Sequence, residues 1–259
     1  MSSVKPLLLS EWRAMILAAG FGTRLKPLTE RLPKPLVPVA GLPMLALSLN
    51  RLRRLKPRML VVNGHHLSTQ LETFLEQSAY GFQQTEYLYE PLILDTGGAI
   101  RNASRYLRGP FFVTTNADVV SDISLLEAVT QHLKRRSLVT MLLHDRERYN
   151  QVEVDCRGRI RGFGRSRPAS GSRILAYTGI QICSPLLLDL MAREPSGRPF
   201  SLITFYRRLL AAGRLDIISH VVDTQDNYYW RDVGTPDDLV AIEHDLVHNP
   251  GLAARLGIV

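Results

Sequence analysis

The chain has 259 residues, of which 45% are hydrophobic and 22% are charged. This length and composition are typical of a globular protein with a sizeable core, and they exclude a disordered chain. No apolar run approaches the about 18 residues of a membrane span, which excludes an integral membrane protein. The formal net charge of +8 favours anionic partners such as nucleotides or sugar phosphates, but the scattered arginines form no basic stripe typical of nucleic-acid binding.

Residues 14–143 alternate short apolar runs with helical patterns. The apolar runs end at glycine, asparagine or aspartate, as buried strands do, and Leu45, Leu49 and Leu52 have the spacing of a helix face. Strands that alternate with helices favour a mostly parallel sheet covered on both faces. This part of the chain predicts strands at 15–19, 59–62, 85–89, 111–115 and 138–143, and helices at 45–55, 67–74, 98–106 and 123–133.

The pattern changes after residue 150, where short β segments are separated by turns. Such segments predict an antiparallel excursion built on the edge of the sheet. Further on, Gly213 ends a helical pattern, and Thr235 is predicted to cap a last helix from Pro236, because proline is tolerated in a first turn. The predicted segments are strands at 152–155, 160–163, 176–182, 216–222 and 228–232, and a helix at 202–212.

A glycine loop follows the first predicted strand, in Leu17-Ala18-Ala19-Gly20-Phe21-Gly22-Thr23-Arg24. Glycine lets the backbone approach a ligand closely, and successive N–H groups there can bind phosphate oxygens, while Arg24 adds a planar cation suited to phosphate. The chain lacks the GxxxxGK[ST] of a P-loop and the third glycine of a dinucleotide-binding loop. The segment is therefore a candidate phosphate-binding loop of another kind, with a plain turn as the alternative.

Lys34 stands between two prolines shortly after this loop, in Pro33-Lys34-Pro35. Prolines fix φ and keep the backbone stiff and extended, so the lysine is held on a preset backbone. That arrangement suits a charge directed at a ligand, whereas a solvated lysine in a surface loop is the alternative. Next to the glycine loop, we favour the ligand-binding interpretation.

Residues 14–43, AMILAAGFGTRLKPLTERLPKPLVPVAGLP, resemble the signature of the nucleoside-diphosphate-sugar pyrophosphorylase family, the sugar-1-phosphate nucleotidyltransferases. The resemblance implies a three-layer α/β/α, Rossmann-like nucleotidyltransferase fold with a mixed, mostly parallel central sheet and a small antiparallel excursion. It also implies a reaction that converts a nucleoside triphosphate and a sugar 1-phosphate into a nucleotide sugar and pyrophosphate. We expect an N-terminal lead-in at 1–13 and a single domain at 14–259, whose sugar-facing part spans about 144–232.

Asp118 and Asp232 are candidate metal ligands, because each follows a predicted strand and α/β sheets bind ligands at the carboxyl ends of strands. Mg²⁺ in nucleotide sites is usually held by one or two carboxylates together with phosphates. The family has similar aspartates, and the resemblance implies that Asp118 and Asp232 share a Mg²⁺ cofactor. Taken singly, Asp118 is equally typical of a turn and Asp232 of a helix-capping partner.

The resemblance also implies roles for the remaining nucleotide-site residues. Arg24 would hold the leaving pyrophosphate, and Lys34 would neutralise charge on the phosphate being transferred, as the two catalytic residues. The segment 94–100 resembles the base-recognition loop, although a simple helix N-terminus would need the same glycines. The expected nucleotide contacts are Leu17, Ala18, Ala19, Gly20, Gly22, Thr23, Thr96, Gly97 and Gly98.

The expected sugar side departs from the family in two places. Asn150 stands where a glycine usually follows the tyrosine, and Arg165-Ser166-Arg167-Pro168 stands where the family often has Glu-Lys-Pro. Arg167 supplies a cation in place of the lysine, but Ser166 cannot replace a carboxylate that accepts sugar hydroxyls, so the usual sugar is in question. The expected sugar-phosphate contacts are Asn116, Tyr149, Asn150, Arg167, Thr178 and Gly179.

Substrate choice stays open at this point. No β-helix repeat follows Gly234, and the chain resembles short family members that use GTP with mannose- or heptose-1-phosphate, or UTP with N-acetylmuramate-1-phosphate. The base, the sugar, the pathway and the oligomeric state, monomer or homodimer, are not specified by the sequence. A non-catalytic nucleotide-sensing subunit of the same fold is the alternative function, and the complete set of Arg24, Lys34, Asp118 and Asp232 counts against it.

The two cysteines, Cys156 and Cys183, are far apart and do not form a disulfide framework. The start of the chain lacks the apolar stretch and cleavage site of a signal peptide. We therefore expect a cytoplasmic enzyme with no membrane or nucleic-acid partner.

Overall fold

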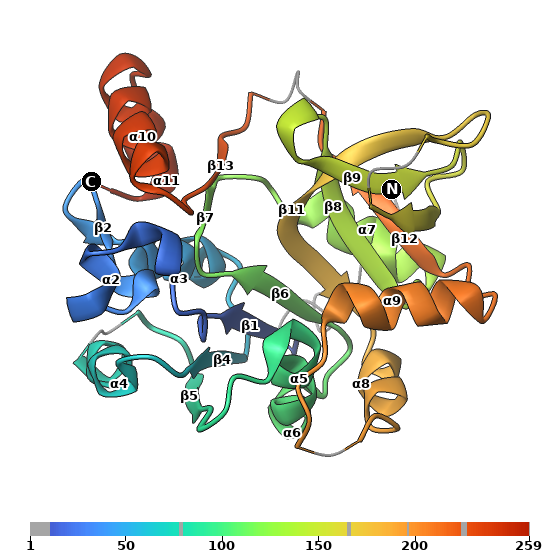
Figure 1. Cartoon of the computed structure of the whole chain (residues 1–259), viewed down its shortest axis with the longest axis horizontal. Coiled ribbons are helices and arrows are strands. Elements are labelled where there is room, and N and C mark those ends of the chain that lie inside the picture. Colours follow the sequence, from blue (N-terminus) through green and yellow to red (C-terminus); the bar gives the residue numbers. More distant parts are fainter. Residues whose placement is uncertain (1–10, 78–79, 165–166, 196, 224–226, 259) are drawn as a thin grey trace. The chain divides into compact units, whose positions relative to one another are not determined.

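A computed structural model describes residues 11–77, 80–164, 167–195, 197–223 and 227–258 (Figure 1). These residues form two compact units, both discontinuous in sequence. The glycine-loop unit contains the described residues within 11–93, 115–123 and 228–258, and the β11 unit contains those within 94–114 and 124–227. Arg165 and Ser166 of the expected sugar side lie outside the described residues.

Three parallel strands form the sheet of the glycine-loop unit: β1 (Arg13–Leu17), β4 (Met59–Gly64) and β5 (Gln84–Tyr89). Because parallel strands end at the same edge of a sheet, the loops that follow β1, β4 and β5 begin side by side. The other elements of the unit are η1 (Thr23–Leu25), α2 (Leu28–Arg31), η2 (Lys34–Leu36), β2 (Pro38–Val39), β3 (Leu42–Pro43), α3 (Met44–Arg54), α4 (Ser68–Gln77), β7 (Val119–Ser121), β13 (Trp230–Asp232), α10 (Pro236–His248) and α11 (Leu252–Leu256).

A hydrophobic cluster in this unit joins segments that are far apart in the sequence. Its buried members include Leu25 after the glycine loop, Val37 after the proline segment, Val120 and Val233. Burial of each such side chain contributes about 1.5–3 kcal/mol, so the cluster fixes the segments that carry it. The predicted functional residues Arg24, Lys34, Asp118 and Asp232 stand one to three positions before these anchors.

The β11 unit is built around the long strand β11 (Arg173–Cys183), which pairs antiparallel with β8 (Val139–His144) on one side and with β9 (Asn150–Val154) on the other. β10 (Ile160–Phe163) extends this antiparallel part beyond β9, β12 (Ile217–Val221) lies parallel to β8, and β6 (Phe112–Asn116) neighbours β11. The expected antiparallel excursion is thus confirmed. The helices of the unit are α5 (Asp95–Asn102), α6 (Ser104–Leu107), α7 (Leu126–Arg135), η3 (Glu147–Tyr149), α8 (Leu186–Met191) and α9 (Leu202–Ala211).

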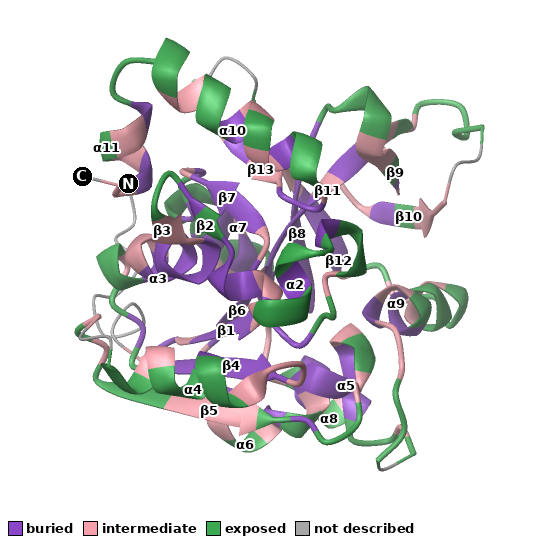
Figure 2. Cartoon of the chain, turned by 60° about the vertical axis from the view of Figure 1, so that its left-hand side comes forward, coloured by how far each residue is buried: buried purple, intermediate pink, exposed green. Residues whose placement is uncertain are grey.

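The predicted strands and helices correspond to observed elements, with ends that differ by a few residues, except that the helix predicted at 98–106 is divided into α5 and α6. Buried residues concentrate in the strands, and helices such as α10 present a mainly exposed outer surface (Figure 2). The predicted cap at Thr235 is confirmed: its hydroxyl accepts the N–H of Asp238, whose carboxylate accepts the N–H of Thr235 at 2.9 Å. Among the described residues, no helix combines the length and apolar character that crossing a membrane requires.

Candidate active site

The glycine loop joins β1 to η1, and its two glycines differ in what surrounds them. Gly22 has a φ of 64°, and a Cβ placed on it would lie 2.8 Å from the Cβ of Lys34 and 2.9 Å from Cγ2 of Thr29. The hydroxyl of buried Thr29 donates to the carbonyl of Gly22 at 2.9 Å. Gly20 is exposed and has open space where a Cβ would point. Gly22 is therefore required by the turn, whereas Gly20 leaves the backbone accessible to a ligand.

Lys34 is aimed inward by the proline segment. Pro33 and Pro35 are buried, and the ammonium of Lys34 lies 2.5 Å from Oδ2 of Asp118, with the two side chains 12% and 24% exposed. The solvated-lysine alternative is therefore excluded. The pair joins two of the predicted functional residues, which are 84 positions apart in the sequence.

A short antiparallel ladder brings the two aspartates together. In the pairing of β7 with β13, Asp232 is opposite Val119, the residue after Asp118, and the N–H of Val233 donates to the carbonyl of Asp118 at 2.9 Å. Asp118, directly before β7, is consequently adjacent to the position that pairs with Asp232 on β13. Burial, and then the charge of Asp118, raise the pKa of Asp232 to about 6, although the cations of Lys34 and Arg24 act in the opposite direction.

The donor set fits a hard divalent cation. The second carboxylate oxygen of Asp118, Oδ1, is buried and has no hydrogen-bond partner among the described residues. A buried, unpaired anionic oxygen beside a second carboxylate is costly unless a cation or a donor is supplied. No cluster of three or more His, Cys, Asp or Glu side chains suited to a metal occurs in the described part of the chain, so Asp118 and Asp232 would leave several coordination positions to water and phosphate, as Mg²⁺ prefers.

Arg24 is exposed and extends over the backbone that follows Asp232. A Cβ placed on buried Gly234 would lie 2.6 Å from Nη2 of Arg24, so this glycine leaves room for the guanidinium. The structure thereby brings Arg24, Lys34, Asp118, Asp232 and the glycine loop into one unit. Such an arrangement presents two cations and a pair of carboxylates to a polyphosphate.

A polar chain links the carboxyl ends of the three parallel strands. The N–H of Ala18 donates to Oδ1 of Asn63 at 2.9 Å, and the amide of Asn63 donates to the carboxylate of Glu90 at 2.8 Å. Asn63 and Glu90 are both buried. In the sequence, Asn63 follows the strand predicted at 59–62 and precedes a glycine, a pattern that indicates only a turn. The chain of contacts fixes the backbone at Ala18, one of the predicted nucleotide contacts.

Arg51 is a second residue that sequence reasoning did not single out. Its guanidinium is enclosed within the glycine-loop unit and donates to the hydroxyl of Thr115 at 2.7 Å. Burial lowers the pKa of Arg51 to about 10, although nearby Asp122 acts to raise it. The contact holds Thr115 directly before predicted Asn116, whose neighbour Ala117 donates its N–H to the carbonyl of Leu17 at 3.0 Å.

The predicted nucleotide contacts Thr96, Gly97 and Gly98 belong to the β11 unit, at the start of α5. The N–H groups of Gly97 and Gly98 donate to the carbonyl of Phe200 at 3.0 and 3.2 Å, and a Cβ on Gly97 would lie 2.4 Å from the Phe200 ring. The hydroxyl of Thr96 accepts the N–H of Leu202 at 3.1 Å. Close packing against Phe200 thus explains why these positions are glycines, and their contact with a nucleotide stays a prediction.

Most of the predicted sugar contacts also lie in the β11 unit. The side chain of Asn150 bridges the loop before it, accepting the N–H of Arg146 at 3.0 Å and donating to Asp145 at 2.7 Å. Thr178 is buried and donates to the carbonyl of Leu142 at 2.9 Å, and Gly179 has a φ of 79° at an irregularity of β11. Tyr149 ends η3, and Arg167 is exposed. Their role in sugar binding stays a prediction.

Comparison with known proteins adds to this geometry. The family described as "Nucleotidyl transferase" matches residues 13–249. The chain belongs to this nucleotidyl transferase family. It is 34% identical over 254 residues to mannose-1-phosphate guanylyltransferase of Mycobacterium tuberculosis, covering 94% of this chain and 68% of that protein. It is 32% identical over 241 residues to N-acetylmuramate alpha-1-phosphate uridylyltransferase of Caulobacter vibrioides, covering 89% of this chain and 95% of that one.

A solved structure of HddC from Yersinia pseudotuberculosis, complexed with GMP-PN, has a TM-score of 0.73 at 20% identity and covers 90% of this chain and 99% of that one. At this identity the likeness concerns the fold. The expected α/β nucleotidyltransferase fold, with a mixed, mostly parallel central sheet and helices on both sides, is confirmed. The nucleotidyltransferase is therefore an enzyme of the class that transfers nucleotidyl groups in nucleotide-sugar synthesis.

Proposed function

We propose that this nucleotidyltransferase condenses a nucleoside triphosphate with a sugar 1-phosphate. A phosphate oxygen of the sugar 1-phosphate attacks the α-phosphorus in line, a new P–O bond forms, and the bond from the α-phosphorus to the bridging oxygen breaks as pyrophosphate leaves. No protein nucleophile is needed. The observation that carries the proposal is the meeting of Lys34, Asp118 and Asp232, from three separate segments, beside the glycine loop.

The chain's own residues contribute position and charge. Backbone N–H groups around exposed Gly20 bind the triphosphate, and Arg24 holds the leaving pyrophosphate through its planar guanidinium. Lys34 neutralises charge that develops on the phosphate being transferred, and its preset backbone keeps the reorganisation small. Because phosphoryl-type transfer needs little covalent work from the protein, these contributions account for most of the catalysis.

Asp118 and Asp232 would hold a Mg²⁺ ion. When bound, the ion supplies charge neutralisation on the phosphate oxygens. The unpaired buried oxygen of Asp118 and the raised pKa of Asp232 both support a cation at this place. Asp118 also forms an ion pair with Lys34, and this contact fixes the positions of the carboxylate and the ammonium relative to each other.

For the substrates, we propose GTP with mannose-1-phosphate or a heptose 1-phosphate as the first choice. The support is the 34% identity to the guanylyltransferase of Mycobacterium tuberculosis over 94% of the chain. UTP with N-acetylmuramate-1-phosphate is the second choice, supported by the Caulobacter uridylyltransferase, which the chain covers almost completely.

A substrate matrix tests both levels of the proposal. Pyrophosphate release is measured with Mg²⁺ for UTP, GTP, CTP and dTTP against mannose-, glucose-, heptose- and N-acetylmuramate-1-phosphate. One strongly preferred pair identifies the substrates, and its dependence on Lys34 and Asp118 links the activity to this site. Release of pyrophosphate that is unchanged in Lys34→Ala and Asp118→Asn would refute the proposed mechanism.

A further inference from the structure

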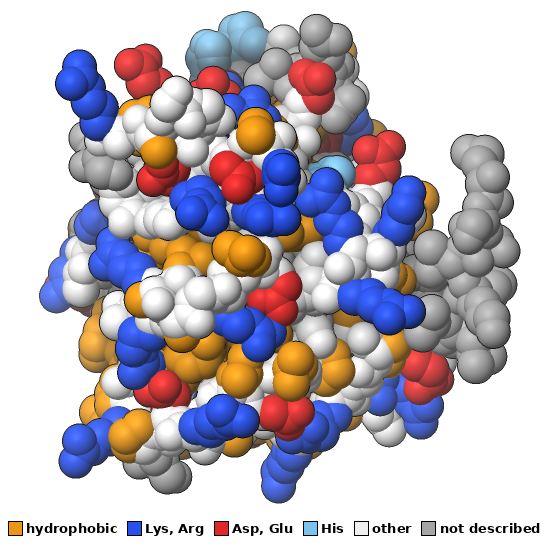
Figure 3. All heavy atoms as spheres, turned by 90° about the vertical axis from the view of Figure 1, so that its right-hand side faces the viewer, with side chains coloured by type: hydrophobic (Ala, Val, Ile, Leu, Met, Phe, Trp, Pro, Cys, Tyr) orange, Lys and Arg blue, Asp and Glu red, His pale blue; other side chains and the backbone are white. Residues whose placement is uncertain are grey.

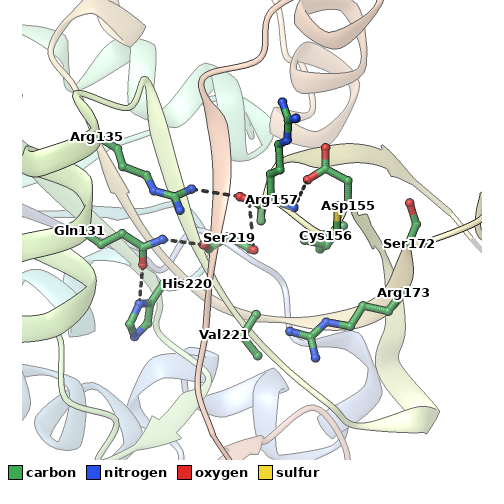
Figure 4. A pocket seen from close by; sticks show the side chains of 13 residues that line it. Gln131, Arg135, Asp155, Cys156, Arg157, Ser172, Arg173, Ser219, His220 and Val221 are labelled. Carbon is green, nitrogen blue, oxygen red and sulfur yellow. Dashed lines mark hydrogen bonds between the residues drawn. The ribbon is translucent and has the colours of Figure 1, made fainter.

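The β11 unit contains a pocket of about 760 Å³. Its walls are the last turns of α7, the turn between β9 and β10, the start of β11, and β12 (Figure 4). Apart from two valines, the lining consists of polar or charged side chains and glycines, among them Gln131, Arg135, Ser172, Arg173 and Ser219. A pocket of this size and polarity suits a small hydrophilic ligand rather than an apolar one.

Three arginines line the pocket, and the side chain of Arg157 extends away from those of Arg135 and Arg173 (Figure 4). Arg135 and Arg173 enter from opposite walls and extend toward its centre (Figure 4). One guanidinium nitrogen of Arg135 donates to the carbonyl of Arg157 at 3.1 Å, which leaves its other N–H groups for a ligand. Arg173 is exposed, and no hydrogen bond or ion pair of its guanidinium is found within the described residues.

The single acidic residue of the lining, Asp155, already has partners. Its carboxylate accepts the N–H groups of Arg157 and Arg159, each at 2.9 Å, and so holds the turn between β9 and β10. Gln131 likewise is held, by His220 and by the carbonyl of Ser219. Among the three arginines of the lining, Arg135 and Arg173 are therefore the ones that direct guanidinium N–H groups toward an incoming anion.

The charge of the whole chain is concentrated in the same unit. Residues 94–114 and 124–227 contain 19 Lys and Arg against 11 Asp and Glu, a difference that equals the net charge of +8 of the chain. Figure 3 shows this excess as more blue than red side chains on the side that carries α9 and β12. Such a field raises the local concentration of anions around the pocket.

The pocket is separate from the predicted sugar contacts on β9 and β11, whereas Arg167 belongs to the loop that leads to the pocket residues Gly171 and Ser172. Val154 and Arg173, which are paired, mark the pocket end of β9 and β11, whereas Asn150 and Thr178 lie farther along these strands. At about 3.3 Å per residue, Asn150 is about 13 Å from Val154, and Thr178 about 17 Å from Arg173. A ligand in the pocket would thus be additional to the substrates of the proposed reaction.

We propose that this pocket binds the phosphate group of a small phosphorylated metabolite, through the guanidinium groups of Arg135 and Arg173. Planar guanidinium groups match phosphate oxygens in bidentate geometry, and the pocket leaves space for the rest of a sugar-sized molecule beside Ser172 and Ser219. The proposal does not depend on which substrates the active site takes.

Cys156 provides a readout at the pocket itself. It lines the pocket and is exposed, whereas Cys183, the other cysteine of the chain, is buried. The experiment measures the rate at which the uncharged reagent N-ethylmaleimide modifies Cys156, by mass spectrometry on the full-length protein. Glucose 6-phosphate, inorganic phosphate and glucose are added in turn, with potassium chloride at matched ionic strength.

Glucose 6-phosphate is expected to slow modification of Cys156, and glucose is not. Arg173→Gln should raise the glucose 6-phosphate concentration for half-protection about tenfold, the effect of losing one charged hydrogen-bonding partner. Arg136→Gln is the matched control, because Arg136 adjoins Arg135 and is exposed but does not line the pocket. Stronger protection by glucose 6-phosphate than by inorganic phosphate identifies a phosphate ester as the ligand, and equal protection identifies free phosphate.

The Lys34→Ala variant separates the pocket from the active site. Protection that persists in Lys34→Ala and weakens in Arg173→Gln supports the proposal. Protection that is lost in Lys34→Ala but kept in Arg173→Gln would assign it to the active site and overturn the proposal, as would the absence of any protection of the wild-type protein. An unchanged thermal midpoint of Arg173→Gln verifies that the variant is folded.

Discussion

Replacement of Lys34 by methionine keeps the length and apolar stem of the side chain and removes its charge. The ammonium lies 2.5 Å from Asp118, and Asp232 is beside it. The gross attraction across that distance is about 7 kcal/mol at an effective dielectric constant of about 20, but desolvation and partial exposure of both groups reduce the net value to about 1–3 kcal/mol. We expect the free energy of unfolding without Mg²⁺ to fall by about this amount.

The loss of kcat, expressed as a free energy, should exceed the loss in the free energy of unfolding. Loss of one preorganised charge at a developing anion costs about 10²- to 10³-fold in kcat. In contrast, Mg²⁺ should bind the free Lys34→Met protein more tightly than the wild type, because the competing cation beside Asp118 is gone. A role limited to stability would not produce these opposite changes.

Steady-state pyrophosphate release gives kcat, and isothermal titration calorimetry gives Mg²⁺ affinity. Lys26→Met serves as the control, since Lys26 belongs to the same stretch of chain but forms an exposed pair with Glu30, and its loss should change stability by less than about 1 kcal/mol. A kcat of Lys34→Met within threefold of the wild type would refute the assigned role of the ammonium.

The glycine loop, the aspartate pair and a buried histidine can each be tested by substitution. Gly22→Ala should destabilise the protein by about 1–3 kcal/mol, because Gly22 has a positive φ and the Cβ of Lys34 is close. Gly20→Ala should lower turnover but leave the midpoint of urea unfolding unchanged, and equal midpoints for the two variants would contradict this expectation. Asp118→Asn and Asp232→Asn should each abolish Mg²⁺-dependent turnover, while circular dichroism shows an unchanged fold. EDTA should abolish the activity of the wild-type protein, and full activity in EDTA would contradict the proposed role of the metal. Burial lowers the pKa of His132 to about 4. The stability that the neutral imidazole contributes is therefore complete above pH 6.5, the usual pKa of the group, and is lost as the pH falls toward 4. His132→Gln should reduce the difference in unfolding free energy between pH 7.5 and pH 5 by about 2 kcal/mol, and an unchanged difference would show that another group is responsible.

Local signals in the sequence predicted the elements and the motif residues well. The period of apolar residues located the strands, and Thr235 before Pro236 marked the start of α10, because capping chemistry is confined to a few neighbouring residues. The glycine loop and Lys34 were recognisable for the same reason. The proximity of Asp118 to Asp232 was expected from family resemblance, and the β7–β13 ladder supplies its physical basis.

Such local signals could not predict the contacts between segments that are distant in the sequence. Asn63 and Glu90 form a buried polar chain that depends on the pairing of strands, and neither residue differs locally from an ordinary turn or surface residue. Arg51 belongs to a cluster with Arg53 and Arg54 that suggests a solvated helix end, yet its position at the border of the buried face encloses the guanidinium, while Arg53 and Arg54 are exposed. The pocket between α7 and the β9–β10 turn has no motif at all, because its arginines come from separate elements.

The ladder between β7 and β13 has a consequence for how the enzyme matures. Its strands are only three residues long, and they join positions more than a hundred residues apart. Closing so long a loop has an entropic cost that so few hydrogen bonds do not offset, so the ladder must wait for α10 and the apolar cluster around Val233 to assemble. During synthesis, the glycine loop and Lys34 emerge early, but the second aspartate emerges late. The paired carboxylates are therefore expected to be among the last features of the glycine-loop unit to form, after much of its β1–β4–β5 sheet, so the proposed metal site would be completed late.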